Sequence, residues 1–385
     1  MHSVGWARGM GYSPYNTRFR DFRRIFNQSI GPRACQRPDF MAVEEQENKK
    51  FLRNILKGPE RFFEHARHSH RSTASLLLKV AYGYTVESEN DSFVKIAEDA
   101  MLGFSKASEP GAFWVDNFPS LKYVPSWIPG AGFKKVAHTM RMDLERLYNV
   151  PFDFVKSEMR KGTAFPSFTS KFLQEKMEET DAYDEEFIKA ACASLYSGNI
   201  SAVFLDLLYS NNTPSSVTSF ILAMTLYPDV QVKAQAELDA LIGKDLRLPT
   251  FSDRDYLPYV NAIVKEVLRW NPSMLHDEEI YPEPSEFRPE RYLAEDGQLR
   301  ALQRAEDPAQ IAFGFGRRVC PGMSLAENSV FLAIATLLYV FNISKAKNAS
   351  GEDITPAVEY DGFICHPRPF RCQIAPRSSD LAALL

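Results

Sequence analysis

The chain has 385 residues, of which 45% are hydrophobic and 24% charged, a balance typical of a globular protein with a buried core. Its formal net charge is −4, so it lacks the basic excess of most nucleic-acid binders, and we expect no nucleic-acid partner. The five cysteines are odd in number and include no CxxC pair, which argues against a disulfide framework or a structural zinc site and favours a reducing, intracellular setting.

Apolar residues recur with helical spacing over most of the chain. The spacing predicts a basic amphipathic helix at 18–27 and further helices at 45–67, 92–107, 133–160, 184–209, 216–242, 255–270 and 325–339. Strand-like alternation is sparse and lies mainly at 362–365 and 370–374, while prolines mark loops at 117–129 and 282–289. The sequence shows no repeat or low-complexity segment. We therefore expect one mainly helical domain over residues 1–385, with small β-sheet elements.

Membrane-spanning segments are not predicted. The first residues contain no apolar stretch as long as that of a signal peptide. The longest uninterrupted apolar run, 330–341, is too short to cross a bilayer. A longer stretch, 190–209, is interrupted by Asn199 and Asp206. We interpret both stretches as buried helices and expect no transmembrane anchor in this chain.

A glycine-rich segment at residues 313–322 contains the best candidate for a metal ligand, Cys320. A thiolate donates strongly to iron when it is kept deprotonated and away from water. Gly314 and Gly316 allow the backbone to bend tightly and to approach a ligand closely. Arg318, two residues before the cysteine, can reach an anionic group such as a propionate. The alternative, a buried structural cysteine in a glycine turn, does not account for so many residues at fixed offsets before a long apolar helix.

This segment resembles the haem-binding signature of the cytochrome P450 family, FxxGxRxCxG, at every defined position. The resemblance implies a haem cofactor (iron protoporphyrin) with Cys320 as its axial thiolate ligand. It further implies that Arg318 is a propionate partner and that the Phe313 ring shields the sulfur. Gly316 and Gly322 occupy the two glycine positions of the signature, and Gly322 permits close packing where the next helix begins.

Two more motifs stand in the family's order. Glu266 and Arg269 lie three residues apart on one predicted helix face, and Arg291 follows in the segment FRPERY, which resembles the family's PERF-type segment. The resemblance implies that these three residues form a buried charge network. Each motif taken alone also fits solvated surface charges. The three charges in this order favour a network, because a lone buried charge is very costly and buried charges must therefore pair with each other.

Other segments extend the resemblance over nearly the whole chain. Residues 10–25 resemble the family's arginine-rich helix near the haem, with Phe19 where many members have Trp. There Arg23 is the expected propionate contact, although a solvated helix face accounts for it equally well. The segment 121–133 is similar to that of basidiomycete members, and 362–370 resembles the terminal hairpin that fungal members place over the substrate. We therefore expect a fungal, microsomal type of member.

The family's oxygen-activating helix is disturbed. Members carry an acid followed by Thr in its middle, for proton delivery during oxygen activation. Here 195–198 resembles the approach to that site and 213–217 its exit, but 199–212 resembles nothing in the family. When the helix is aligned with the family from residue 195 onward, the acid and alcohol positions fall on 201–202 (Ser-Ala). When it is aligned backward from residue 217, they fall on 211–212 (Asn-Asn). Neither alignment supplies the acid.

Thr213 is the best remaining catalytic alcohol, although a helix-terminal residue before Pro214 explains it at least as well. A second irregularity follows Pro272, where members have a loop and strands that line the pocket. Here the residues after Pro272 resemble a sequence that family members carry at a later position. On that resemblance we interpret His276 as structural. We hypothesise that a retained intron and a skipped exon explain these two places. A transcript that encodes this same chain would refute the hypothesis.

The resemblance implies a haem-thiolate monooxygenase that oxidises an apolar small molecule with O2, in secondary metabolism by analogy. Electrons would come from an NADPH-dependent P450 reductase. The family resides on the cytosolic face of the endoplasmic reticulum membrane, so we expect that location with peripheral membrane contact through exposed apolar residues such as Trp127 and Ile128. The alternative is a catalytically impaired haem-binding pseudoenzyme or the product of a damaged gene, because the acid–alcohol pair and the segment after Pro272 are missing.

Overall fold

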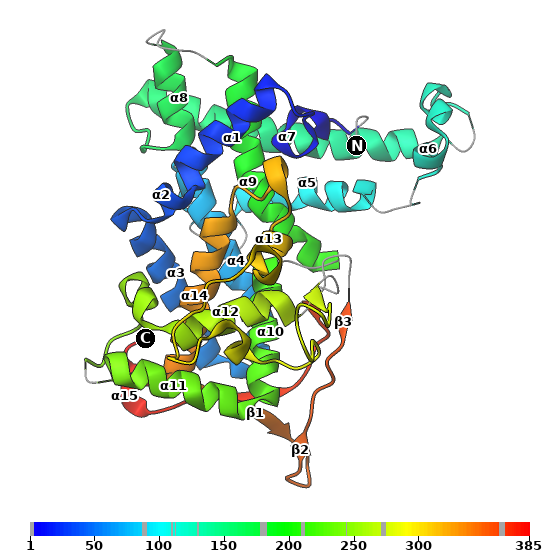
Figure 1. The fold of residues 1–385 in the computed structure, drawn as a ribbon. Coiled ribbons are helices and arrows are strands. Elements are labelled where there is room, and N and C mark those ends of the chain that lie inside the picture. The colour runs from blue at the N-terminus through cyan, green and yellow to red at the C-terminus, as the bar shows by residue number, and fades with distance from the viewer. Residues whose placement is uncertain are drawn as a thin grey trace. The chain divides into compact units, whose positions relative to one another are not determined.

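The computed structural model describes residues 4–86, 91–108, 111, 113–128, 131–177, 183–208, 212–243, 245–270, 275–361 and 366–385 (Figure 1). The chain forms two compact units. The first unit comprises Met1–Ser29 and Arg71–Leu208, and the second comprises Ile30–His70 and Tyr209–Leu385. Helices dominate the described part of both units, which confirms the mainly helical prediction.

The first unit is built from long helices. They are α1 (Thr17–Ile30), the last part of α4 (Phe62–Tyr82), α5 (Ser92–Ser108), α6 (Trp114–Asn117), α7 (Gly132–Lys161), α8 (Phe168–Met177) and α9 (Glu185–Leu208). The 3-10 helices η1 (Trp6–Arg8) and η2 (Met10–Tyr12) precede α1, and η4 (Pro119–Tyr123) lies between α6 and α7. Helix α5 packs on α7 and α9. Helix α1 joins this core through Phe22, whose ring stacks on Phe187 with the centroids 4.6 Å apart.

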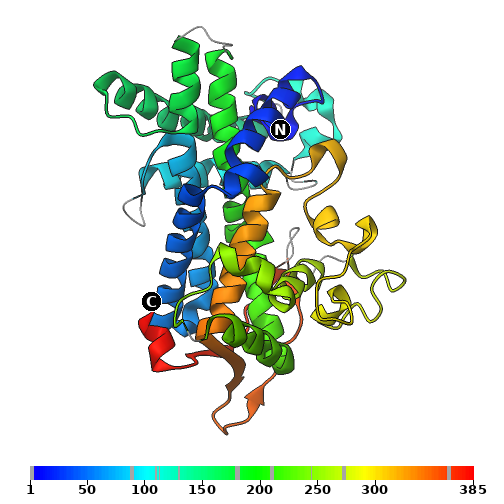
Figure 2. The same cartoon turned by 60° about the vertical axis from the view of Figure 1, so that its left-hand side comes forward.

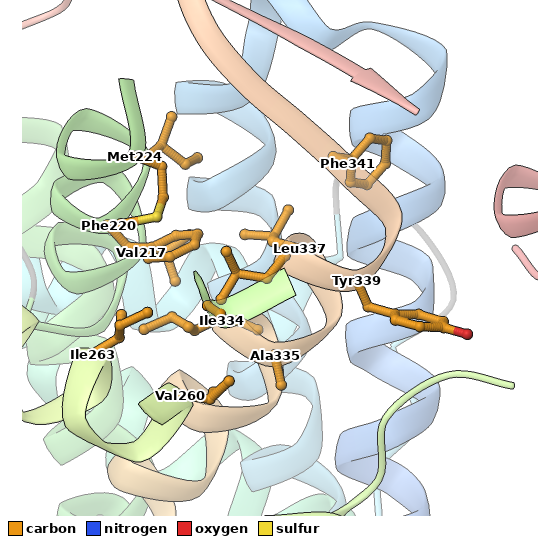
Figure 3. Close-up of a cluster of buried hydrophobic side chains, with 14 of the residues drawn as sticks. Val217, Phe220, Met224, Val260, Ile263, Ile334, Ala335, Leu337, Tyr339 and Phe341 are labelled. Carbon is orange, nitrogen blue, oxygen red and sulfur yellow. The ribbon is translucent and has the colours of Figure 1, made fainter. Parts of the chain in front are cut away.

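The second unit surrounds a central helix, α14 (Met323–Val340). The other helices are α2 (Pro32–Cys35), α3 (Pro38–Lys57), the first part of α4, α10 (Asn212–Leu226), α11 (Pro228–Ile242), α12 (Pro258–Trp270), α13 (Ala309–Ala312) and α15 (Ser379–Ala383). The 3-10 helices are η3 (Pro59–Arg61), η5 (Phe251–Tyr256), η7 (Pro289–Tyr292), η8 (Arg304–Glu306) and η9 (Gly316–Arg318). Every residue from 330 to 340 is buried, and Ile334 and Leu337 face Phe220 and Ile263 in the core (Figure 3).

Two small sheets complete the second unit. Strand β1 (Phe341–Lys347) directly continues α14 and lies between β2 (Asp353–Ile354) and β5 (Cys372–Pro376) in an antiparallel sheet, with Ile343 opposite Ile374. Strands β3 (Tyr360–Asp361) and β4 (His366–Pro367) form a second antiparallel pair. The strand predicted at 370–374 is confirmed with a shift of two residues, whereas 362–365 lies outside the described residues. The periodicity gave no indication of β1.

Two predicted helices are wrong as single elements. The helix at 45–67 is divided between α3 and α4, because Gly58 ends α3 and Pro59 begins a separate 3-10 turn. The helix at 216–242 is divided between α10 and α11 at Tyr227, which has the non-helical angles φ −121° and ψ 70°. Proline removes a backbone donor and disfavours helical geometry in the residue before it, which explains both breaks.

Helix α14 is the one helix among the described residues that is long and apolar enough to cross a membrane. Two thirds of its apolar window, 67%, is buried inside the protein. In Figures 1 and 2 it runs alongside α3 within the second unit. The predictions of buried helices for 330–341 and 190–209 hold for the parts that are described, because α14 and the amino-terminal half of α9 are both core helices.

Candidate functional site

The segment predicted to hold the metal forms a tight loop between α13 and α14. The Cys320 N–H donates to the Phe313 carbonyl across 2.8 Å, which closes the loop. Gly314 and Gly316 have φ values of +79° and +58°, in the left-handed region that favours glycine. The backbone thus bends at the two glycines, as the sequence predicts. Cys320 lies three residues before α14 begins.

Cys320 is exposed, so the alternative of a buried structural cysteine is wrong. Cys35 and Cys192 are buried, and burial raises the pKa of each thiol to about 12. Burial also raises the pKa of the half-buried Cys372 to about 12. These three sulfurs are therefore protonated at neutral pH. Of the four cysteines that the structure describes, only Cys320 presents its sulfur at the protein surface.

The side chains near Cys320 in the chain are of types that suit an anionic cofactor held through one sulfur. Arg318, on the same loop, is exposed and offers a cation, and Phe313, where the loop begins, is half-buried. The sequence predicted close packing at Gly322, but the neighbouring protein atoms would also tolerate a residue with a side chain there. A Cβ added there would lie 3.8 Å from the Cys320 sulfur and 3.9 Å from Ile30 Cδ1, which is ordinary contact.

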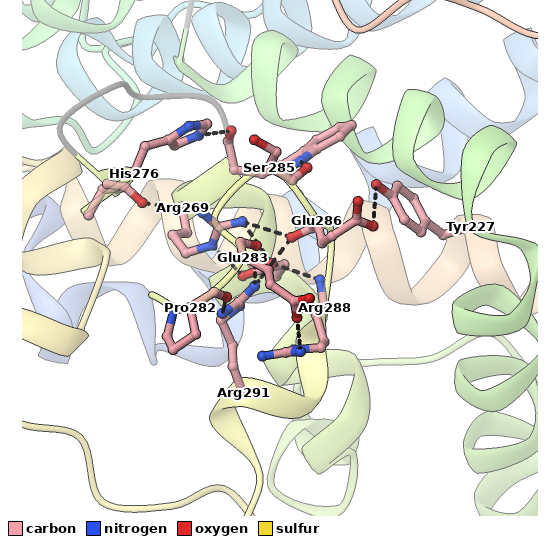
Figure 4. A network of polar contacts seen from close by, with 12 residues as sticks. Tyr227, Arg269, His276, Pro282, Glu283, Ser285, Glu286, Arg288 and Arg291 are labelled. Atoms are coloured by element: carbon pink, nitrogen blue, oxygen red, sulfur yellow. Dashed lines mark hydrogen bonds and ion pairs between the residues drawn. The ribbon is translucent and has the colours of Figure 1, made fainter. Parts of the chain in front are cut away.

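Glu266, Arg269 and Arg291 come together, as their order predicts. Figure 4 shows the two arginines among their polar contacts. The Arg269 guanidinium donates to both carboxylate oxygens of Glu266, at 2.7 and 2.9 Å, and both side chains are fully buried. Arg291 donates from Nε to Glu266 Oε1 at 3.1 Å. The backbone N–H of Arg288 donates to the same oxygen at 2.8 Å, so four donors neutralise this buried carboxylate.

The remaining guanidinium donors of the network bond to backbone carbonyls. Arg269 reaches the carbonyls of Leu275 at 3.2 Å and Glu286 at 3.1 Å, and Arg291 reaches those of residues 282, 283 and 286. The network therefore joins α12 to the irregular chain before η7. Its backbone acceptors could not be found from the sequence. The ring of His276 bonds through Nε2 to the Trp270 carbonyl at 2.8 Å, a structural contact as predicted.

Two predicted site residues lie elsewhere in the chain. Arg23 is a half-buried residue of α1, in the first unit. Thr213 is the second residue of α10, and Pro214 follows it in the first turn, where proline is tolerated. Only the backbone of Thr213 is described. The roles predicted for both residues therefore stay predictions. Residues 201 and 202 belong to α9, so the unmatched segment continues that helix as far as Leu208.

Comparison with known proteins identifies the class of this fold and site. The model of the cytochrome P450 family matches residues 6–275 and 271–374. A similar protein, cytochrome P450 monooxygenase 208 of Postia placenta, is 42% identical over 99% of this chain and 77% of its own length. Cytochrome P450 monooxygenase claR of Ampulloclitocybe clavipes is 38% identical, covering 99% and 73%. Tryptamine 4-monooxygenase of Psilocybe cyanescens is 36% identical, covering 98% and 78%.

The chain therefore belongs to the cytochrome P450 family. It is an oxidoreductase of the monooxygenase class, of fungal type, and the cofactor of its family is a haem bound through a cysteine thiolate.

The comparison also supports the irregularity after Pro272. The match to the family model is divided into two segments that meet at residues 271–275. The alignment with the Postia placenta protein spans 415 positions. Because this chain has 385 residues, at least 30 of those positions have no counterpart in it. The chain thus lacks residues that its relatives carry.

Proposed function

We propose that residues 1–385 form the haem domain of a monooxygenase in which Cys320 is the axial ligand. The observation that carries the proposal is the exposed Cys320 sulfur on the glycine loop before α14, in a chain whose family binds haem through a cysteine. When bound, a thiolate-ligated haem supplies the activation of O2 and the insertion of one oxygen atom into a substrate.

The chain's own residues then hold and shield the cofactor. Arg318 is exposed on the loop and would donate to a propionate, and we propose Arg23 of α1 for the same task. In the haem-bound protein the Phe313 ring would help to shield the sulfur from water, which would keep the thiolate a strong donor. Gly316 gives the loop its bend, and Gly322 leaves room beside the sulfur. Glu266, Arg269 and Arg291 act structurally, because their network is fully occupied by protein partners.

The proposed substrate is an apolar small molecule of secondary metabolism, with O2 and electrons from an NADPH-dependent reductase. The support is the similarity to fungal monooxygenases, one of which is named for tryptamine. We propose Thr213 as the alcohol that holds a proton near the oxygen site, because it stands at the start of α10 where family-like sequence resumes.

The first prediction tests this activity. We expect the purified chain, with haem, a fungal P450 reductase, NADPH and ¹⁸O2, to transfer one ¹⁸O atom to a probe such as tryptamine or an apolar terpene, measured by mass spectrometry. We expect Thr213→Val to lower product per NADPH at least about tenfold and Thr213→Ser to restore it. Haem-bound protein that forms no labelled product from a broad panel of such probes would instead support a passive haem binder.

We further propose peripheral contact with the cytosolic face of the endoplasmic reticulum membrane through the segment 113–128 of the first unit. This segment exposes Trp114 (74%), Tyr123 (77%) and Trp127 (80%) together with Phe118 and Lys122. Trp and Tyr favour the membrane–water interface because their rings are apolar and their N–H or O–H groups stay in contact with water. Ile128, also predicted to make this contact, is half-buried.

A second prediction follows for membrane binding. We expect Trp114→Ser with Trp127→Ser to reduce the affinity for phosphatidylcholine–phosphatidylserine vesicles, measured by co-sedimentation, at least about thirtyfold. Each buried aromatic ring contributes about 1–3 kcal/mol, so the two together contribute about 2–6 kcal/mol. The matched control is Phe165→Ser, which removes an aromatic ring of equal exposure (71%) outside the segment. Equal losses in the control and in the double variant would contradict the proposed contact.

A further inference from the structure

Two polar contacts join α3 to α14 inside the second unit. Ser329 Oγ donates to Glu44 Oε1 across 2.9 Å, and Asn48 Nδ2 donates to Thr336 Oγ1 across 2.9 Å. Glu44 and Asn48 are four residues apart on one face of α3, and Ser329 and Thr336 are seven apart on one face of α14. The Glu44 contact is the one nearer to the Cys320 end of α14.

Glu44 occupies a position that helical spacing assigns to an apolar residue. It lies four residues after Phe40 and seven before Phe51, and both phenylalanines are buried in the core. Its side chain is 6% exposed, and Oε2 has no hydrogen-bond partner among the residues that the structure describes. An ionised carboxylate that is buried with one oxygen unpartnered is very costly, whereas the protonated carboxyl costs much less.

The charged and titratable groups that act on Glu44 come from three elements. Glu45 on α3 opposes its ionisation, and Arg254 on η5 favours it. Cys35 on α2 also lies within electrostatic range. From α14 the facing group is the neutral Ser329 hydroxyl. Arg254 is a weak counter-ion because it is shared with Glu327 and Asp255.

We infer that Glu44 is a proton-dependent positioning residue for α14. Its protonated form lets the amino-terminal half of the helix pack against α3. Ionisation at alkaline pH places a buried charge on Oε2, and hydration of that charge separates α3 from α14 despite the Ser329 hydrogen bond, which loosens the Cys320 loop. The part of this inference that concerns Cys320 rests on the proposed function. The part that concerns folding stands on the α3–α14 contact itself.

The direction of the pH effect follows from burial, which raises the pKa of Glu44 from 4.5 to about 8. Between these values the folded chain holds a proton that the unfolded chain has released. The stabilisation is therefore complete below about pH 4.5 and is lost as the pH rises to about 8. From this group alone the folding constant falls roughly tenfold per pH unit in that window.

The first arm of the test measures urea unfolding of the full chain from pH 5 to 9. We expect Glu44→Gln, which is neutral at every pH, to reduce the pH slope of the folding constant by about one proton relative to the unchanged chain. Asn48→Ala removes the contact that does not titrate and should lower stability without changing the slope. Ser329→Ala should extend the pH-dependent window upward, because its hydroxyl favours the ionised carboxylate. An unchanged slope in Glu44→Gln would overturn the inference.

The second arm measures the carbon-monoxide difference spectrum of the reduced, haem-loaded chain over the same pH range. We expect the band of thiolate ligation to decline above about pH 8 in the unchanged chain and in Asn48→Ala, and to persist in Glu44→Gln. The same pH profile in all three proteins would overturn the link from Glu44 to the Cys320 loop. A thiolate band absent from all three at every pH would refute Cys320 as ligand, while the urea slopes would still decide the role of Glu44.

Discussion

Replacing Cys320 with alanine should abolish the carbon-monoxide difference band of thiolate-ligated haem and reduce oxygen transfer to background. The reason is that the proposed ligation depends on one sulfur, and no second described cysteine is placed to substitute for it. Burial raises the pKa of Cys35, Cys192 and Cys372 to about 12, so none of these supplies a thiolate at neutral pH. The measurement is the reduced spectrum of the purified, haem-supplemented variant.

The same substitution should leave the fold nearly unchanged. Because Cys320 is exposed, its removal should alter the free energy of unfolding of the haem-free chain by less than about 0.5 kcal/mol. Cys372→Ala is the matched control, since it removes a half-buried sulfur from the same unit and should keep the spectrum. If Cys320→Ala keeps a thiolate band of full height, the assignment of the ligand is wrong.

Local sequence patterns predicted what depends on local geometry. The positive φ of Gly314 and Gly316 and the start of α14 follow from residues within the same ten-residue segment. The meeting of Glu266, Arg269 and Arg291 depends on distant residues, yet it was predictable because its motifs recur in a fixed order within a family. Resemblance thus supplied tertiary information that hydrophobic periodicity does not contain.

What could not be predicted depends on tertiary contacts. Strand β1 continues directly from α14 and is stabilised by β5 and by the Gln231 side chain, whose amide bonds to both the N–H and the carbonyl of Ile343 at 2.9 Å. No local sequence pattern predicts these partners. The place of Glu44 in an apolar stripe was visible in the sequence, but its partner Ser329 lies 285 residues away. Helical spacing alone also extended helices through Pro59 and Pro228, although proline is a recognised signal for a break.

The charge network shows why a single substitution in this region should have a large effect. Arg269→Leu should lower the free energy of unfolding by about 3–5 kcal/mol, because it leaves the fully buried Glu266 carboxylate without its two strongest donors. The carbonyls of Leu275 and Glu286 would also lose their partner. A typical domain is stable by about 5–15 kcal/mol, so this loss is a large fraction of the total. Urea unfolding of the purified variant at neutral pH measures it.

The matched control is Arg288→Ala. The Arg288 side chain is 43% exposed and pairs with the exposed Glu283 at 2.6 Å, while its contribution to the network comes from the backbone N–H, which alanine keeps. An exposed ion pair contributes at most about 1 kcal/mol, so the control should be nearly as stable as the unchanged chain. Arg269→Leu should also release the chain around residues 275–286 to proteolysis, since Arg269 holds it to α12. Equal stability of the two variants would mean that Arg291 and the Arg288 N–H suffice to neutralise Glu266, and that the network is not what holds this part of the second unit together.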